Sequence, residues 1–326
     1  MTRADGTCWV VTDGKPGMEN QCRGLAEAVG LPTIVKRIQV LFPWRFLPPS
    51  LWIAPLAAIA ASGDPLLPPW PRLLIATGRA SVAPALAIQA ASHGQTFAVQ
   101  IQNPGTGLSR FDLVVPPRHD RLSGPNVVST RGALHRVTAE RLAAAAREFA
   151  GSVGHLPRPL VAVLIGGSNR SYRLDATAIS KLADGLRALT GQGAALLVTP
   201  SRRTGAENER ILRDRLAGLP AVIWDGTGPN PYFGYLGLAD AIVVTGDSVS
   251  MVSEAASTGK PVYVFELPGG SAKFRAFHQG LRDEGITRTF AGKLERWTYP
   301  PLDDTAVVAA EVRRRLELPP ATQPVE

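Results

Sequence analysis

Cysteine is scarce in this chain of 326 residues, where Cys8 and Cys22 are the only two. Two thiols cannot build a disulfide framework or a four-ligand zinc site, and their wide spacing does not match a Cys-x-x-Cys redox pair. No other cluster of metal-ligating residues stands out. The sequence therefore predicts plain thiols in a reducing compartment and no metal centre.

Signals for secretion or for a membrane span are also missing. The first residues include an acid, Asp5, where a secretory signal has bases, and the first apolar run is interrupted at Asp13. Residues 46–63 lack charge, but three prolines among them are unfavourable for a membrane-spanning helix. We therefore expect a cytoplasmic protein.

The composition contains too few charged residues for a disordered chain, with 19% charged against 45% hydrophobic. The net charge of +8, from 35 basic and 27 acidic residues, favours anionic partners. Zinc-finger spacing and an RNP-type aromatic motif are absent, and the longest basic run, residues 313–315, is typical of a solvated helix face. We expect no nucleic-acid partner.

Short β-rich runs alternate with helical stretches along most of the chain, which is typical of parallel sheets covered by helices. The alternation pauses in the Gly- and Pro-rich residues 151–159, after a helix predicted over 138–150, and then restarts. The sequence therefore predicts an α/β fold of two Rossmann-like domains, 1–153 and 154–326, with a central cleft. The last helix is expected to pack back on the first domain.

The second half contains two strand-to-turn motifs that suit phosphate binding. In the first, a buried strand at 161–165 runs into Gly166-Gly167-Ser168-Asn169-Arg170. Glycines allow backbone N–H groups to approach a phosphate, and an arginine adds a charge-assisted contact. Arg202 and Arg203, adjacent in the polar turn after the next strand, can do the same. Simple chain reversal and an exposed helix entry are the alternative interpretations of these turns.

In the second motif a hydrophobic strand ends at Asp247 and Ser248, where a helix begins. Free N–H groups and the helix dipole at that end suit a phosphate. Glu254 lies about two turns into the helix among small apolar residues, and it can accept two hydrogen bonds from a ribose diol. Pairing with a surface Lys or Arg is the alternative role of Glu254.

Together with Asn230-Pro231-Tyr232 and Gly259-Lys260-Pro261, the second motif resembles the donor site of the GT-B glycosyltransferases. The resemblance implies metal-independent transfer from a nucleoside diphosphate sugar, with Glu254 on the ribose and no further cofactor. Two positions depart from the family pattern, since the usual glycine of the phosphate turn is Ser248 here and a usual threonine is Met251. The identity of the sugar therefore stays open.

The same resemblance makes residues 154–326 the nucleotide-sugar-binding domain and residues 1–153 the acceptor-side domain. The residues then expected to bind the donor come from the two motifs and from the turns beside them. They are Gly166, Gly167, Ser168, Asn169, Arg170, Arg202, Tyr232, Asp247, Ser248, Val249, Ser250 and Glu254.

At the level of the whole chain, four segments resemble the Elm-type mitochondrial fission family, which has many bacterial members. These segments are residues 12–21, 100–104, 116–120 and 248–254. The Arg- and Ala-rich composition predicts a bacterial member. The family's plant founder is implicated in mitochondrial fission, which implies a non-catalytic adaptor as an alternative to an enzyme.

Glycosyl transfer requires a base that takes the proton of the acceptor hydroxyl. Asp13 ends the first strand and is the first candidate, although many GT-B enzymes have a Gly-rich loop with a histidine there. Asp120 and then His119 follow, because they end a later strand and can form an oriented acid–base pair, and Glu19 comes last. A turn cap at Asp13 and a solvated loop at 119–120 are the alternatives.

Residues 41–60 interrupt the alternation with an apolar run that contains Trp44, Arg45, Phe46 and Trp52. Aromatic side chains beside an arginine suit a lipid interface, which predicts peripheral contact with the inner face of the cytoplasmic membrane. An insertion packed on its own sheet is the alternative.

The function expected from these features is sugar transfer from a nucleotide donor to an envelope or lipid-linked glycan acceptor. A nucleotide-sugar 2-epimerase or hydrolase on the same fold remains the alternative to transfer, beside the adaptor.

Overall fold

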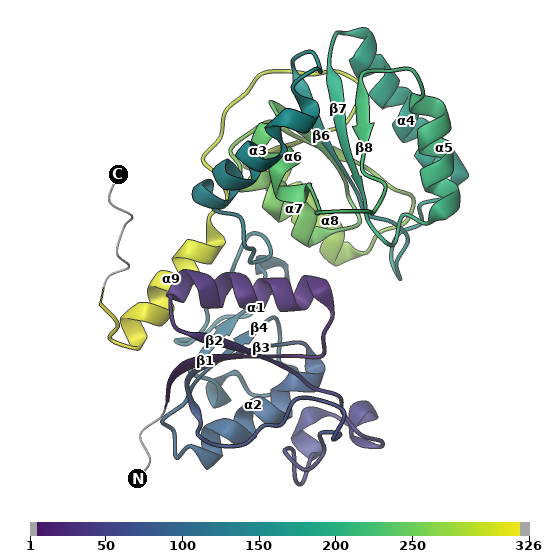
Figure 1. Ribbon diagram of the computed structural model, residues 1–326. Helices are drawn as coiled ribbons and strands as arrows, with labels where there is room; N and C mark the ends of the chain where they lie inside the picture. The colour runs from purple at the N-terminus through teal and green to yellow at the C-terminus, as the bar shows by residue number, and fades with distance from the viewer. Residues whose placement is uncertain (1–4, 320–326) are drawn as a thin grey trace. The chain divides into compact units, whose positions relative to one another are not determined.

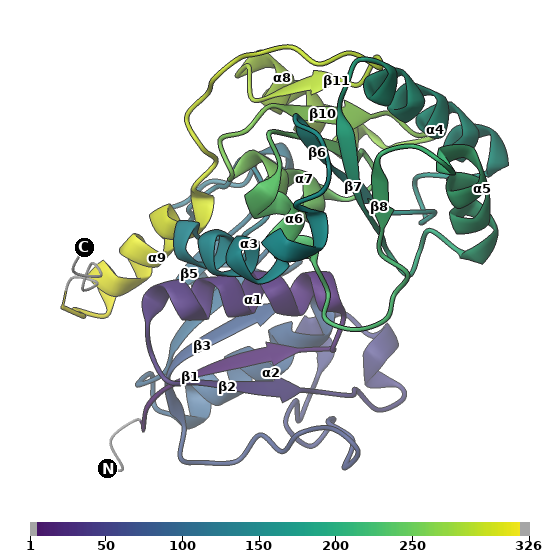
Figure 2. The ribbon, with the colours of Figure 1, turned by 45° about the horizontal axis from the view of Figure 1, so that its top comes forward.

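The computed structural model describes residues 5–319 and divides into two compact units. Unit 1 consists of the described residues up to Arg136 together with those from Asp303 onward, and unit 2 is Val137–Leu302. Each unit contains one parallel sheet with helices on both faces (Figure 1, Figure 2). No helix within residues 5–319 is long and apolar enough to cross a membrane.

The sheet of unit 1 has the strand order β2-β1-β3-β4-β5. Its strands are β1 (Asp5–Thr12), β2 (Thr33–Arg37), β3 (Pro71–Thr77), β4 (Phe97–Ile101) and β5 (Leu113–Val115). Successive side chains of a strand point to opposite faces, so β1 contributes to two cores. Cys8 and Val10 pack towards α1 (Pro16–Val29) and α9 (Asp304–Arg315). Trp9 and Val11 pack towards α2 (Arg79–Ala91) on the other face.

The last helix, α9, completes the first of these cores with Val308, Ala309 and Val312. Its basic last turn holds the helix on the unit, since Arg313 donates to the carbonyl of Val29 and Arg315 donates to that of Asp112 at 2.9 Å. The run 313–315 therefore anchors the helix, in place of the wholly solvated face expected from the sequence.

The sheet of unit 2 has the strand order β11-β10-β9-β6-β7-β8. Its strands are β6 (Leu160–Ile165), β7 (Ala195–Pro200), β8 (Ala221–Ile223), β9 (Ala241–Thr245), β10 (Val262–Phe265) and β11 (Thr287–Thr289). One face packs on α4 (Ala176–Gly191) and α5 (Ala206–Leu216). The other face packs on α3 (Ala139–Val153), α6 (Tyr232–Leu238), α7 (Val249–Ala256) and α8 (Ala272–Asp283).

The boundary between the units differs from the one expected at residues 153 and 154. Helix α3 packs so closely on α6 that a Cβ at Gly234 would lie 2.6 Å from the ring of Phe149. The helix therefore belongs to unit 2, and the chain passes between the units after Arg136 and again after Leu302. The Gly- and Pro-rich residues 151–159 end α3 and lead into β6 within one unit.

Candidate functional site

The motifs singled out in the second half meet at one point of the sheet of unit 2. In its strand order, β6 is flanked by β9 on one side and β7 on the other, so the direction of strand succession reverses between β6 and β9. In open α/β sheets, ligands bind beyond the carboxyl ends of the strands at such a switch point. Gly166 follows β6 and Gly246 follows β9, which places both turns at this position.

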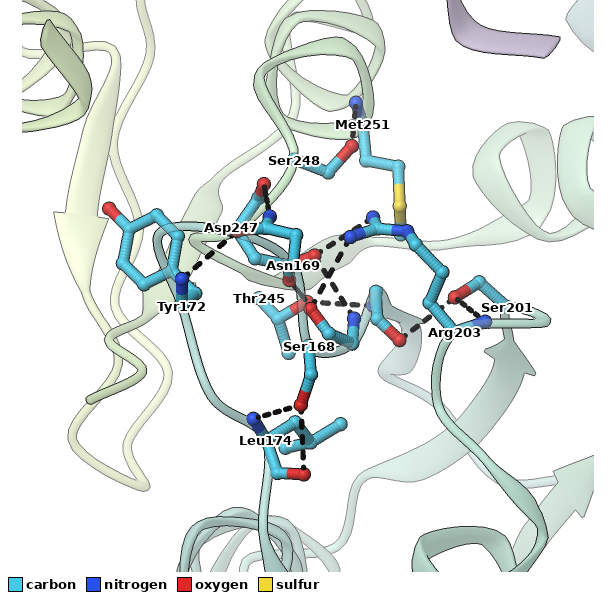
Figure 3. A network of polar contacts seen from close by, with 12 residues as sticks. Ser168, Asn169, Tyr172, Leu174, Ser201, Arg203, Thr245, Asp247, Ser248 and Met251 are labelled. Carbon is cyan, nitrogen blue, oxygen red and sulfur yellow. Dashed lines mark hydrogen bonds and ion pairs between the residues drawn. The ribbon is translucent and has the colours of Figure 1, made fainter. Parts of the chain in front are cut away.

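A buried carboxylate, Asp247, joins the two turns (Figure 3). Its side chain is fully buried, accepts the N–H of Gly167 at 3.0 Å and the hydroxyl of Thr245 at 2.7 Å, and pairs with Arg203 at 2.9 Å. The Thr245 hydroxyl oxygen in turn accepts the N–H of Gly166 at 2.8 Å. Buried charges require such partners, and here they come from three strand ends. Asp247 therefore holds the loops together from within.

The two glycines allow this close approach. A Cβ at Gly166 would lie 2.3 Å from both carboxylate oxygens of Asp247, and one at Gly167 would lie 1.9 Å from the carbonyl oxygen of Arg203. Both N–H groups already donate within the protein. The glycines thus serve the packing of the loops on each other, where the sequence suggested an approach to phosphate.

The rest of the first motif is divided between internal bonds and solvent. Asn169 donates from its side-chain amide to the carbonyl of Asp247 at 3.1 Å, and Ser168 accepts the N–H of Leu174 at 2.9 Å. Arg170 and Arg202 are exposed within the loops that follow β6 and β7. Their guanidinium groups are therefore accessible to a ligand at the sheet edge.

Helix α7 begins at the switch point directly after this network. Ser248 is its N-cap and accepts the N–H of Met251 at 3.3 Å. The N–H groups of a first helical turn have no acceptor within the helix, and they lie at the positive end of its dipole. Val249 and Ser250 form that turn and are half-buried. The arrangement suits a phosphate.

Glu254 lies on the same helix with only 8% of its surface exposed. Its partner is Tyr232 of α6, whose hydroxyl donates to Oε2 at 2.5 Å. Burial raises the pKa of Glu254 to about 7 against the lowering effect of this hydrogen bond. Glu254 is therefore a buried carboxyl group that changes charge near neutral pH, and its partner is a tyrosine in place of the surface cation considered from the sequence.

Lys260 fixes the helix that carries Tyr232. Its ammonium group donates to the carbonyls of Leu236 and Gly237, both at 2.7 Å, at the end of α6. Burial lowers the pKa of Lys260 to about 8. The Gly-Lys-Pro segment after α7 thus positions the partner of Glu254.

A pocket of about 260 Å³ adjoins the switch point at the end of β10. It is lined by Gly246 and Val264, by the charged side chains Glu266 and Arg275, and by His278 of α8. The ring Nε2 of His278 lies 2.7 Å from the carbonyl oxygen of Gly246, so this nitrogen carries the proton. Burial lowers the pKa of His278, which keeps the ring neutral.

In unit 1 the first candidate base, Asp13, also lies at a switch point. The strand order reverses between β1 and β3, and Asp13 follows β1 directly. Its carboxylate is partly exposed and accepts the ammonium of Lys15 at 2.5 Å. A carboxylate held in this way can accept a proton from a bound hydroxyl.

The other candidate bases of unit 1 lie elsewhere. Glu19 is bound by Arg37 through two hydrogen bonds of 2.8 Å, which lower its pKa, so it is a structural carboxylate. His119 and Asp120 form a short 3₁₀ turn after β5, with Nε2 and Oδ1 4.0 Å apart. Since β3 and β4 lie between β1 and β5, the ends of the outer two are about 14 Å apart. The unit does not bring Asp13 and this pair together.

Residues 16–316 match the profile of the family described as "Mitochondrial fission ELM1". The chain belongs to this family. The mitochondrial fission protein ELM1 of Arabidopsis thaliana is 38% identical over 273 residues, which cover 76% of this chain. The match covers 64% of the plant protein, so the chain spans less than two thirds of this relative's length. The uncharacterized protein RP120 of Rickettsia prowazekii is 28% identical over 263 residues, 68% of this chain and 73% of that protein.

Solved structures with the same fold include two UDP-GlcNAc 2-epimerases. The enzyme of Methanocaldococcus jannaschii in complex with UDP-GlcNAc and UDP gives a TM-score of 0.54 at 11% identity, covering 95% of this chain and 99% of that one. The enzyme of Neisseria meningitidis bound to UDP-GlcNAc gives 0.51 at 11% identity, covering 95% and 92%. Os79 of O. sativa in complex with UDP gives 0.52 at 12% identity, covering 94% and 92%.

These comparisons confirm the ELM1 family and the GT-B-like fold of two Rossmann-like units predicted from the sequence. In this ELM1 member, sequence reasoning missed two residues of the site, Thr245 and His278. It considered Arg203 together with Arg202 for a phosphate, whereas Arg203 pairs with Asp247. The polar strand end of Thr245 was a usable signal. The bond from His278 to Gly246 joins residues 32 positions apart, for which no local pattern exists.

Proposed function

We propose that unit 2 binds the nucleoside diphosphate of a nucleotide sugar and that the protein transfers the sugar, without a metal, to an envelope or lipid-linked acceptor. The observation that carries the proposal is the start of α7 at the switch point, followed on the same helix by the buried Glu254. A helix N-terminus is suited to a phosphate, and a carboxylate two turns further is suited to a ribose diol.

The diphosphate would be bound by the N–H groups of Val249 and Ser250 and by the exposed guanidinium groups of Arg170 and Arg202. The carboxylate of Asp247 does not oppose this, because Arg203 neutralises it and its lone pairs are occupied within the protein. The same groups would stabilise the diphosphate as it leaves the sugar.

A bound ribose would replace the single hydrogen bond that Glu254 accepts from Tyr232 with two hydrogen bonds. In the unbound protein the carboxyl group interacts with the hydroxyl of Tyr232. A ribose offers two adjacent hydroxyl donors, and hydrogen bonds to a charged acceptor are stronger than those to a neutral one. Binding therefore favours the ionised form of Glu254.

Asp13 would act as the base in transfer. The acceptor oxygen forms a bond to the anomeric carbon, the bond from that carbon to the diphosphate oxygen breaks, and Asp13 takes the acceptor proton. Lys15, at 2.5 Å, holds the carboxylate in place. The pocket beside His278 has room and polar groups for the sugar ring.

Binding of UDP, GDP, CMP and ADP, followed by their sugars, tests the proposal by thermal unfolding and calorimetry. UDP comes first because the epimerase of M. jannaschii and Os79 were solved with it. One nucleotide at about 100 times its dissociation constant should stabilise the protein by about 2.7 kcal/mol. Glu254→Gln should weaken binding by about 1.5 to 3 kcal/mol. Glu207→Gln, an exposed acid of α5, is the matched control and should bind as wild type.

Family membership favours a second candidate, a non-catalytic adaptor that keeps the fold for protein binding. A folded protein that binds none of the four nucleotides would support the adaptor and contradict the first proposal. The similarity in fold to two UDP-GlcNAc 2-epimerases favours a third candidate, epimerisation or hydrolysis of the nucleotide sugar. Product analysis without an added acceptor detects either reaction. An epimerised nucleotide sugar would identify the reaction as epimerisation and not transfer, and free sugar would identify it as hydrolysis.

A further inference from the structure

Large apolar side chains protrude from one short segment of unit 1. Eight large hydrophobic residues of the described chain are exposed, and five of them lie between residues 41 and 53. Phe42 is 75% exposed, Phe46 64% and Ile53 90%, and Leu41 and Leu51 complete the set. We call residues 41–53 the apolar loop; it lies between β2 and β3, beside the sheet of unit 1 (Figure 1).

Trp44 and Trp52 anchor the apolar loop on unit 1. Trp52 is only 8% exposed, packs with Ala58 and with Ala83 of α2, and lies 6.2 Å from the ring of Trp44. Its indole N–H donates to the carbonyl of Leu47 at 3.3 Å. The tryptophans expected to face an interface are therefore the anchor, and the phenylalanines point outward.

The exposed side is aromatic and positively charged. The rings of Phe42 and Phe46 contact each other edge to face at 6.3 Å, and the guanidinium of Arg45 lies 4.7 Å from the centre of the Phe46 ring. Arg45 is the one charged residue of the apolar loop, and its charge is positive. The surface therefore complements a partner that is apolar and negatively charged.

We propose that the apolar loop inserts into the headgroup region of an anionic lipid bilayer. Side chains exposed by 64% to 90% stand away from the surface instead of lining a groove, and a bilayer accepts them without a matching shape. Arg45 adds attraction to anionic headgroups.

The position of the loop connects the bilayer with the candidate base. Arg79, the first residue of α2 after β3, donates to the carbonyl of Phe46 at 3.0 Å. The loop therefore adjoins the same carboxyl edge of the sheet that ends in Asp13. A glycan acceptor carried by a lipid would be presented at this edge; that step rests on the proposed function, whereas bilayer binding does not.

Sedimentation of the full chain with vesicles tests the proposal. Vesicles of equal parts phosphatidylglycerol and phosphatidylcholine should bind the protein, and vesicles of phosphatidylcholine alone should bind it less. A triple variant, F42S/F46S/I53S, should partition at least about tenfold more weakly. Arg45→Gln should lose about fivefold on the anionic vesicles only. Val307→Ser, which removes an exposed apolar side chain of α9, is the matched control and should bind as wild type.

Equal partitioning of the wild type and the triple variant would overturn the proposal. So would a concentration-dependent dimer in light scattering that the triple variant abolishes without any change in vesicle binding, because the loop would then serve a second copy of the chain. Unchanged thermal unfolding of the triple variant shows that the fold is intact. Nucleotide binding measured on the same samples separates this result from the proposed function.

Discussion

The two units place their switch points in opposite environments. In unit 2 the turns meet around Asp247, whose carboxylate is fully buried and bonded to three strand ends. In unit 1 the corresponding position is occupied by Asp13 and Lys15, an ion pair open to solvent. The loops of unit 2 are thus joined by bonds buried within the protein, whereas the loop that carries Asp13 is held by an ion pair exposed to solvent.

The largest expected effect comes from breaking the buried network. Asp247→Ala should lower the free energy of unfolding by about 3 kcal/mol or more, because it leaves the buried N–H of Gly167 and hydroxyl of Thr245 without their acceptor and removes the ion-pair partner of Arg203. Urea unfolding measures the loss. A variant as stable as wild type would show that the network does not hold the loops.

The pH dependence of stability should have opposite signs in the two units. The pKa of Glu254 is about 7 in the folded protein against an ordinary 4.5, so its contribution is full below pH 4.5 and is lost as pH rises through 7. Since one pKa unit corresponds to about 1.4 kcal/mol, the loss is about 3 kcal/mol. Glu19 has a lowered pKa, so its contribution is present above 4.5 and is lost as pH falls.

Unfolding of Glu254→Gln and Glu19→Gln across pH 3.5 to about 8 checks both signs. Relative to wild type, Glu254→Gln should gain stability as pH rises from 4.5 to 7. The deficit of Glu19→Gln should shrink as pH falls below 4.5. If the stability of both variants changes with pH in the same way as that of the wild type, these two carboxyl groups do not give the units opposite pH dependences.

The next largest loss of stability is expected from a substitution of Gly167. Gly167→Ala brings a Cβ to within 1.9 Å of the carbonyl oxygen of Arg203 and should cost about 1 to 3 kcal/mol. Gly280→Ala in α8 meets nothing within 4 Å and should be neutral or stabilise by up to about 1 kcal/mol. Thermal unfolding of both variants checks the contrast, and equal stabilities would contradict the packing argument.

The smallest effect is expected at the edge of unit 1. Lys15→Gln removes an ion pair whose lysine is largely exposed, and stability should change by less than about 1 kcal/mol. If urea unfolding shows that Lys15→Gln loses as much stability as Asp247→Ala, the two switch points do not differ in the way described above.

Regular elements with local signals were predictable from the sequence. The strand expected at 161–165 is β6 (Leu160–Ile165), and the helix expected over 138–150 is α3 (Ala139–Val153). Helix α6 was missed because it contains Gly234 and Gly237, which disfavour a helix in isolation. Both glycines are needed where α3 packs on α6, since a Cβ at Gly237 would lie 2.5 Å from the carbonyl oxygen of Leu142. The same packing explains why the unit boundary was misplaced.

The candidate site was predictable at the level of strand ends and less so at the level of atoms. The motif around Asp247 and Glu254 indicated a buried strand, a turn and a helix, as the structure has them. The sequence could not show which of Arg202 and Arg203 turns inward, because that depends on the distance to a strand end 44 residues later. The pairing of Glu254 with Tyr232 depends equally on the packing of α6.

Helix α9 affects the order in which the two units can fold during synthesis. Unit 1 needs Val308, Ala309 and Val312 to cover the face of its sheet beside α1, and these residues leave the ribosome after all of unit 2. Unit 2 can therefore finish folding during synthesis as soon as Leu302 has emerged, while unit 1, which starts first, must wait for its final helix.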